Sequence, residues 1–414
     1  MPPLTILFLI VLAITLATRL WLAARQARAV AAHADQVPAP FADSITLEEH
    51  RKAAAYTADR LRLGRVHLIF DGAILVLVTV GGGYAALASA VGRLGLPTLW
   101  SGVVTLSALA VILAALDLPF SAYSTFRIEA RYGFNRTTPA LFLADLGKGL
   151  LLAALLGLPL LTAVLWLMAR AGRLWWLYAW ILWIAFGLTV SYLWPRFIAP
   201  LFNRFRALEA GELRERLTRL VAACGFTADG LFVMDGSRRS SHGNAYFTGV
   251  GRHKRIVLFD TLIERLEGPE VEAVLAHELG HFRLHHVRVR LLVGALTSFI
   301  GFAVLGWLTG QAWFYGALGV REPSLAAALA LFALVAPLVT FPLAPLSAWW
   351  SRRHEFAADR YAARQADGAA LARALVKLYR DNASTLTPDP LYSAWHDSHP
   401  PALARIAALA GAAS

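Results

Sequence analysis

The chain has 414 residues, of which 57% are hydrophobic and only 16% are charged. Soluble domains are about 45–50% apolar and about 25% charged, so this balance indicates a polytopic membrane protein and excludes an ordinary soluble domain. The net charge of +12 is, in a membrane protein, typical of arginine-rich loops that face anionic lipid, and we expect no nucleic-acid partner. The single cysteine, Cys224, excludes an intrachain disulfide and a cysteine-based metal site.

Seven stretches of roughly 20 apolar residues are long enough to cross a bilayer as helices. Five precede a long polar interval and two follow it. They cover residues 4–24, 67–91, 99–120, 149–168, 174–194, 291–314 and 325–350. Arg19 falls within the first stretch and can snorkel to the interface. Three other ionisable residues, His67, Asp71 and Asp117, fall within the second and third stretches. Because charge is costly in lipid, they either face a wet interior or lie at helix ends.

Basic residues gather in the loops after the first, third and fifth stretches and in the tail after the seventh. The positive-inside rule therefore predicts an N-terminus outside and a C-terminus in the cytoplasm. The predicted organisation is five spans, a cytosolic catalytic insert, two spans and a cytosolic helical tail, at residues 1–194, 195–290, 291–350 and 351–414. Richness in Ala, Leu and Arg suggests a bacterial inner-membrane protein, and nothing indicates its oligomeric state.

The insert has a mixed pattern of helix and strand signals. Apolar spacing predicts a helix over 207–223. Short apolar runs predict strands over 231–234, 244–248 and 255–259, with a turn at Gly249 and Gly251. The predicted fold class is thus an α-helical polytopic membrane protein of about seven spans with a small cytosolic α+β region.

The segment His277-Glu278-Leu279-Gly280-His281 is an HExxH pattern. On a helix, His277 and His281 share one face and can hold a divalent cation, most often zinc. Glu278 can accept a proton from a water molecule that the metal activates. A chance match occurs in on the order of one per cent of chains of this size, so the pattern is fairly specific. We expect the following His285 and His286 to be interfacial polar residues rather than ligands.

A catalytic zinc needs a third protein ligand and one open position. Leu284 and Val287 exclude the HExxHxxGxxH class, which needs Gly and His there. Glu355, just after the last span, is the best candidate, and a solvated acid is the alternative interpretation. Asp359 lies four residues further on and can accept the outer N–H of a ligating histidine, so we count it with Glu278 among the residues that catalysis needs.

Several segments resemble the type I CAAX prenyl endopeptidases, integral-membrane zinc metalloproteases of the gluzincin class. They are HELGH at 277–281, EFAAD at 355–359, SHGNAYFTG at 241–249, SHPP at 398–401 and the stretch from Phe126 to Asn135. The likeness covers nearly the whole chain. It implies seven helices enclosing a large hollow, with a zinc site near the cytosolic face.

The resemblance also implies residue roles. One zinc ion per chain would be held by His277, His281 and Glu355, with Glu278 as the base. Asn244 and His399 would contact the substrate backbone. An edge strand to which the substrate adds as another strand would be formed by Ala245, Tyr246 and Phe247.

Two further residues, Arg405 and His242, stand outside this set. Arg405 would bind the substrate's terminal carboxylate, or it is a surface arginine. His242 is expected to be structural.

The predicted function is a membrane zinc endopeptidase that cuts near the C-terminus of lipid-modified, CAAX-type or membrane-tethered peptides. Its partners would be the bilayer and a peptide or protein substrate, prenylated or not. Because most bacteria lack protein prenylation, a quality-control protease for membrane proteins is the alternative. A transporter or lipid-binding protein with a vestigial HExxH is a third reading, which predicts that Glu278→Gln leaves function intact.

Overall fold

The computed structural model describes residues 2–248 and 253–412, so the expected turn at Gly249 and Gly251 lies outside the described residues. The first half of the chain is helical. Its helices are α1 (Pro3–Ala32), α2 (Leu47–Val78), α3 (Gly83–Gly92), α4 (Thr98–Tyr123), α5 (Pro139–Leu152), α6 (Leu158–Arg170) and α7 (Trp175–Leu193). Their surfaces carry many exposed large apolar side chains, as helices that face lipid do.

Within the described residues, six helices are long and apolar enough to cross a membrane, or seven if the bent pair α2 and α3 forms one span. This pair corresponds to the second predicted span. The bend of 51° lies at the Gly81–Gly83 run, where Gly82 has a φ of 79°. That left-handed conformation costs little only for glycine, so the run breaks the helix.

The last two predicted spans differ in detail from the structure. The sixth ends at Leu308, because α12 (His286–Leu308) stops before Gly310 and Phe314 belongs to the short α13 (Ala312–Ala317). The seventh is divided into α14 (Leu325–Thr340) and α15 (Ala344–Gln365) by a 3-10 turn that contains Pro342. Proline removes a backbone donor, so the α-helical pattern cannot continue there. Helix α15 then runs on past its apolar part, and this extension carries Glu355 and Asp359.

The polar insert forms a four-stranded sheet. Its elements are α8 (Ala199–Phe202), β1 (Phe205–Ala207), α9 (Glu212–Ala223), β2 (Thr227–Met234), β3 (Ala245–Thr248), β4 (His253–Phe259), α10 (Asp260–Ile263) and α11 (Gly268–Arg283). The strand order is β1-β2-β4-β3, with β2 and β4 parallel and both edge strands antiparallel to their neighbours. The predicted helix start at Ala207 is wrong, because residues 205–207 pair with β2 and the helix begins only at Glu212.

Helix α11 lies at the centre of the core of this region. Its Leu275 and Leu279 are buried together with apolar side chains of α9, β4 and α16 (Gly368–Asp381). Burying each leucine contributes about 1.5–3 kcal/mol. Gly280 allows α15 to come close, since a Cβ there would lie 3.2 Å from the Cα of Ala358. The two helices that carry the HExxH and EFAAD motifs are therefore packed directly against each other.

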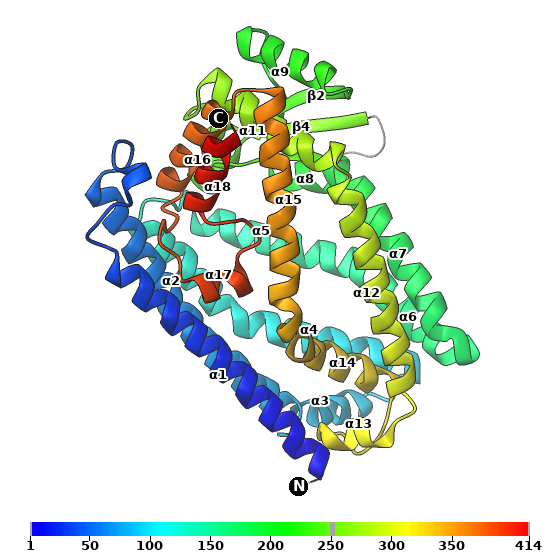
Figure 1. Cartoon of the computed structure of the whole chain (residues 1–414). Coiled ribbons are helices and arrows are strands. Elements are labelled where there is room, and N and C mark those ends of the chain that lie inside the picture. The colour runs from blue at the N-terminus through cyan, green and yellow to red at the C-terminus, as the bar shows by residue number, and fades with distance from the viewer. Residues whose placement is uncertain (1, 249–252, 413–414) are drawn as a thin grey trace.

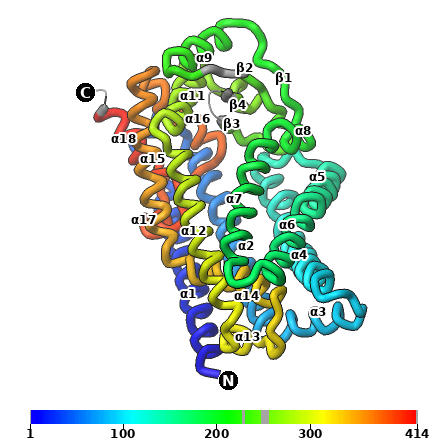
Figure 2. Tube along the Cα trace, turned by 90° about the vertical axis from the view of Figure 1, so that its right-hand side faces the viewer, coloured from blue at the N-terminus to red at the C-terminus, as the bar shows by residue number. Residues whose placement is uncertain are grey.

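Figure 2 shows the sheet and α9 at one end of the molecule, and the N-terminus with α3 and α13 at the other. The tail adds α17 (Pro390–His396) and α18 (Ala402–Ala412). Helix α17 lies against both α1 and α15 (Figure 1). The tail thus connects the first helix of the chain to the helix that carries Glu355.

A cavity of about 820 Å³ lies between α1, α2, the segment 382–385 and α17. His67 and Asp71 line it, and His67 Nε2 lies 3.3 Å from Asp71 Oδ1 and 2.9 Å from Asp117 Oδ1. Of the two placements left open by the sequence, the wet interior is therefore the one found for His67 and Asp71. This cavity forms part of the hollow that the helices enclose.

Candidate metal centre

The HExxH motif occupies the last two turns of α11. A capping box at Glu267 and Glu270 and a proline in the first turn start this helix. His277 and His281 are four residues apart and point their Nε2 atoms at each other, 3.2 Å apart. Burial of α11 in the core fixes the face on which both rings lie.

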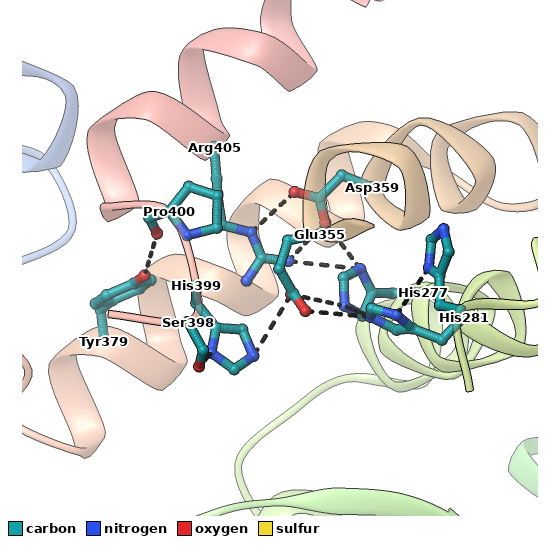
Figure 3. Close-up of polar contacts among 10 residues, drawn as sticks. His277, His281, Glu355, Asp359, Tyr379, Ser398, His399, Pro400 and Arg405 are labelled. Atoms are coloured by element: carbon teal, nitrogen blue, oxygen red, sulfur yellow. Dashed lines mark hydrogen bonds and ion pairs between the residues drawn. The ribbon is translucent and has the colours of Figure 1, made fainter. Parts of the chain in front are cut away.

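Glu355 of α15 completes a group of three side chains that can bind a metal ion. Its Oε2 lies 3.4 Å from His277 Nε2, and its Oε1 lies 3.4 Å from His281 Nε2. One ligand atom from each of the three residues lies within 4.8 Å of the others. Figure 3 shows the carboxylate facing both rings. Glu355 lies 74 positions after His281 in the sequence, yet it meets both histidines in one group.

The three donors fit a tetrahedral metal site. Ligands bound about 2.1 Å from a tetrahedral zinc lie roughly 3.4 Å from one another. Glu355 is only 2% exposed, and its Oε2 has no hydrogen-bond partner among the described residues. A buried carboxylate oxygen without a donor is costly unless it ligates a cation. Two imidazoles and one carboxylate are also a donor set found in catalytic zinc sites.

His277 is oriented by a buried ion pair. Its Nδ1 lies 2.8 Å from Asp359 Oδ1, which leaves Nε2 turned toward the other donors. Arg405 of α18 donates to both oxygens of Asp359, with its Nε 2.8 Å from Oδ2. Although burial alone would lower it, the neighbouring carboxylates of Asp359 and Glu355 raise the pKa of His277 to about 9. A cation at Nε2 would replace that proton.

Of the two roles that the sequence left open for Arg405, the structure tests one. It is only 5% exposed, so the reading as a surface arginine is wrong. Its guanidinium is occupied by Asp359 and lies 3.5 Å from His277 Nδ1. The arrangement favours an orienting role, and binding of a substrate carboxylate by this residue stays a prediction that the geometry does not favour.

His281 is oriented by a residue that the sequence analysis had set aside. Its Nδ1 lies 3.1 Å from Nδ1 of His286, which stacks on His354 with ring centroids 4.0 Å apart. His285 adopts a left-handed φ of 61°, and this turn places His286 at the start of α12 beside the site. Burial lowers the pKa of His281 to about 3, so the ring is neutral, as a ligand must be. This contact depends on the positive φ of His285, which the sequence does not indicate.

Glu278 is the acid of the HExxH motif. Among the described residues its carboxylate makes no hydrogen bond and no ion pair. Burial raises the pKa of Glu278. A free, partly desolvated carboxylate next to His277 is suited to accept a proton.

His399 comes to the site from the segment before α18. Its Nε2 lies 3.4 Å from Glu355 Oε2, while its ring remains 61% exposed. Ser398 Oγ lies 3.1 Å from its Nδ1, and Tyr379 donates a 3.3 Å hydrogen bond to the carbonyl of Pro400. These contacts hold an exposed histidine over the three donors (Figure 3).

Strand β3 places Ala245, Tyr246 and Phe247 at an edge of the sheet, and Asn244 directly precedes the strand. The side-chain Oδ1 of Asn244 accepts from the backbone N–H of Ala245 (2.8 Å), and Asn244 is exposed. Tyr246 packs on Phe259, so its side chain belongs to the sheet. His242 stacks on Phe134 and lies 3.0 Å from Asn382 Oδ1, a packed position consistent with its expected structural role.

Comparison with known proteins identifies the family. Residues 26–204 match the model described as "CAAX prenyl protease N-terminal, five membrane helices", and residues 207–413 match "Peptidase family M48". The chain belongs to peptidase family M48. The first of these matches begins after the first predicted span and covers the next four.

Individual relatives of this M48 peptidase resemble it over most of their length. It is 36% identical to "CAAX prenyl protease 1 homolog" of Arabidopsis thaliana, over 91% of this chain and 90% of that protein. It is 38% identical to "CAAX prenyl protease 1" of Saccharomyces cerevisiae, over 71% and 68% respectively. The crystal structure of S. mikatae Ste24p superposes with a TM-score of 0.92 at 30% identity, covering 99% of both chains. The protein is therefore an integral-membrane metallopeptidase.

Proposed function

We propose that this protein is a zinc endopeptidase that removes C-terminal peptides from lipid-modified, CAAX-type substrates or from other membrane-tethered chains. His277, His281 and Glu355 hold the zinc ion. The observation that carries the proposal is the convergence of these three donors within 4.8 Å, next to an unpaired Glu278. The printed names of the relatives supply the CAAX substrate class.

Zinc, when bound here, would acidify a water molecule and polarise the scissile carbonyl. Glu278 accepts the proton of the attacking water and delivers it to the leaving amine. Asp359 and Arg405 keep His277 in the tautomer that offers Nε2. His399 lies beside Glu355 with an exposed ring, where its N–H can donate to the oxygen on which negative charge develops.

The substrate binds beside β3 as an added strand. The edge of β3 that faces away from β4 offers backbone donors and acceptors to an extended peptide. Asn244 stands at the start of this edge and has both an amide donor and a carbonyl acceptor for a peptide backbone. Tyr246 stabilises the strand by packing on Phe259 rather than by touching the substrate side chain.

The active site faces the cytoplasm in this proposal, and the N-terminus lies outside. Arginine-rich segments surround the sheet, which lies at the opposite end from the N-terminus (Figures 1 and 2). A bacterial inner membrane would be one setting for this orientation. The second candidate function is a quality-control protease for membrane proteins. It is favoured only by a bacterial setting, because most bacteria lack protein prenylation.

Cleavage of a defined peptide tests the function. Purified full-length protein is incubated with a farnesylated peptide ending in a CAAX sequence, and products are measured by mass spectrometry. We expect removal of the last three residues, loss of activity with a zinc chelator, and about 10²- to 10⁴-fold slower cleavage by Glu278→Gln. An unmodified, misfolded membrane protein is the parallel substrate for the alternative.

Two results would contradict the proposal. Undiminished cleavage by Glu278→Gln would remove the base from the mechanism and would indicate a contaminating protease. Degradation of the misfolded protein with no cleavage of the farnesylated peptide would favour the quality-control function.

A further inference from the structure

The cavity beside the catalytic region contains three arginines that the mechanism does not use. Arg19 of α1 and Arg60 and Arg65 of α2 line its wall. None of them makes an ion pair with a described residue. Arg60 lies over the ring of Tyr56 at 5.5 Å, and Arg19 lies over that of Phe341 at 5.6 Å. Three guanidinium groups that line one cavity without an ion pair attract an anion.

The two acids in the lining compensate little of this charge. Asp71 lies 3.3 Å from His67, which also pairs with Asp117. Burial raises the pKa of Asp397, the other acid of the lining. The three arginines outnumber the two acids of the lining, so the cavity keeps a net positive charge.

The cavity reaches the predicted substrate cleft on two walls. His242 lines it and stands two residues before Asn244, and Asp397 lines it and stands two residues before His399. Two extended residues span at most about 7 Å. A peptide held by Asn244 and His399 thus has an open space within a few ångströms of its bound backbone.

The terminal carboxylate of such a peptide needs a cation other than Arg405. That guanidinium donates to both oxygens of the buried Asp359. Three extended residues beyond a scissile bond reach roughly 10 Å. A cavity of about 820 Å³ lies within the range of about 300–1,000 Å³ that encloses small ligands.

We propose that Arg19, Arg60 and Arg65 bind the terminal carboxylate of the peptide substrate, so that this cavity receives the residues that cleavage releases. The inference rests on the proposed peptidase function and names the part of the substrate that this wall recognises. The shared chemistry is an oxyanion, which a lipid phosphate also carries, so the test separates the two sources.

Binding to a non-cleaving protein tests the proposal independently of catalysis. Two peptides identical except for a C-terminal carboxylate or a C-terminal amide are titrated by fluorescence anisotropy into full-length Glu278→Gln protein in detergent. We expect the acid to bind roughly 10- to 100-fold more tightly, as a charged hydrogen-bonded contact provides. Adding Arg60→Gln and Arg65→Gln should abolish this preference and leave amide binding unchanged, which also shows that the double variant is folded.

Single substitutions and a matched control sharpen the result. Arg60→Gln, Arg65→Gln and Arg19→Gln should each reduce the preference for the acid severalfold. Arg51→Gln, on the same helix α2 but exposed and paired with Asp35, should keep it in full. Equal binding of acid and amide before any arginine is changed overturns the proposal, and so does a preference that survives the double substitution.

Lipid forms the second arm of the test. The same titrations are repeated in nanodiscs of zwitterionic lipid with and without anionic phospholipid. We expect the preference for the acid in both. If acid and amide bind alike while Arg60→Gln and Arg65→Gln weaken retention of anionic phospholipid, the wall binds lipid phosphate and the proposal is wrong. Failure of this test leaves the cleavage experiment unaffected, so the two claims fail separately.

Discussion

At the scale of single residues, the site depends on polar groups that position other polar groups. His277 points at Glu355 because Asp359 accepts from its Nδ1, and Asp359 stays ionised in a buried place because Arg405 donates to both its oxygens. Glu278 alone has no such partner. The ligands are thus held in place while the base remains free to exchange a proton.

Replacing Arg405 tests this chain of contacts. Arg405→Leu leaves the Asp359 carboxylate buried without a cation, which typically costs about 3–5 kcal/mol. We expect a lower melting temperature and roughly 10- to 100-fold weaker zinc binding, measured with a competing chelator. Arg373→Leu is the matched control, because its side chain is 55% exposed and its pairs are worth at most about 1 kcal/mol. Unchanged zinc affinity in Arg405→Leu would show that Asp359 needs no partner.

The sequence predicts those parts of the site that depend on local spacing. HExxH places two histidines on one helix face, and Glu355 follows a span on the same predicted side of the membrane. The pairing of Arg405 with Asp359 and the contact of His286 with His281 were missed. The first joins two separate helices, and the second depends on a left-handed residue, so neither leaves a periodic signal.

At the scale of elements, the close packing of α11 against α15 brings the donors together. Gly280 makes this possible, because a Cβ there would lie 3.1 Å from a ring carbon of Tyr361 and 3.3 Å from the carbonyl oxygen of Ala358. The glycine of HELGH therefore has a packing role separate from zinc chemistry.

Adding one methyl group to Gly280 measures this packing. Gly280→Ala gains up to about 1 kcal/mol of helix propensity but overpacks the contact, at about 1–3 kcal/mol. We expect a net lower melting temperature and weaker zinc binding as the two helices separate. Gly268→Ala on the same helix, where the nearest side-chain atom is 3.9 Å away, should have neither effect. A Gly280→Ala protein as stable as the unmodified one would exclude the role of close packing.

Element boundaries were predicted less well than element types. Ala207 was assigned to the start of a helix but pairs with Phe232 of β2, because a strand partner 25 residues away overrides local apolar spacing. The last span was predicted as one helix, although Pro342 divides it into α14 and α15. The edge position of β3 depends on the sheet order, which strand signals alone do not provide.

At the scale of the whole molecule, the sheet and the N-terminus lie at opposite ends. The catalytic region lies far from the N-terminus in both views of the molecule (Figures 1 and 2). Ionisable side chains such as His67 and Asp71 line a cavity instead of facing lipid. A polar interior of this kind lets a peptide chain reach a hydrolytic site that adjoins the bilayer.

Cysteine labelling tests the predicted membrane orientation. Cys224 is buried, and Cys224→Ala provides a background without cysteine. Asp43→Cys, in the exposed loop after α1, should resist an impermeant maleimide applied from outside, whereas Arg93→Cys, exposed after α3, should react. The opposite pattern in intact spheroplasts would place the catalytic region outside.

The central claim is that one carboxylate from α15 joins two imidazoles from α11 around a single metal ion. Zinc content of purified full-length protein, measured by inductively coupled plasma mass spectrometry, tests it most directly. We expect roughly one zinc ion per chain in the unmodified protein and in Glu278→Gln, and far less in the equally conservative Glu355→Gln. A folded Glu355→Gln protein that retains a full zinc ion would contradict the account.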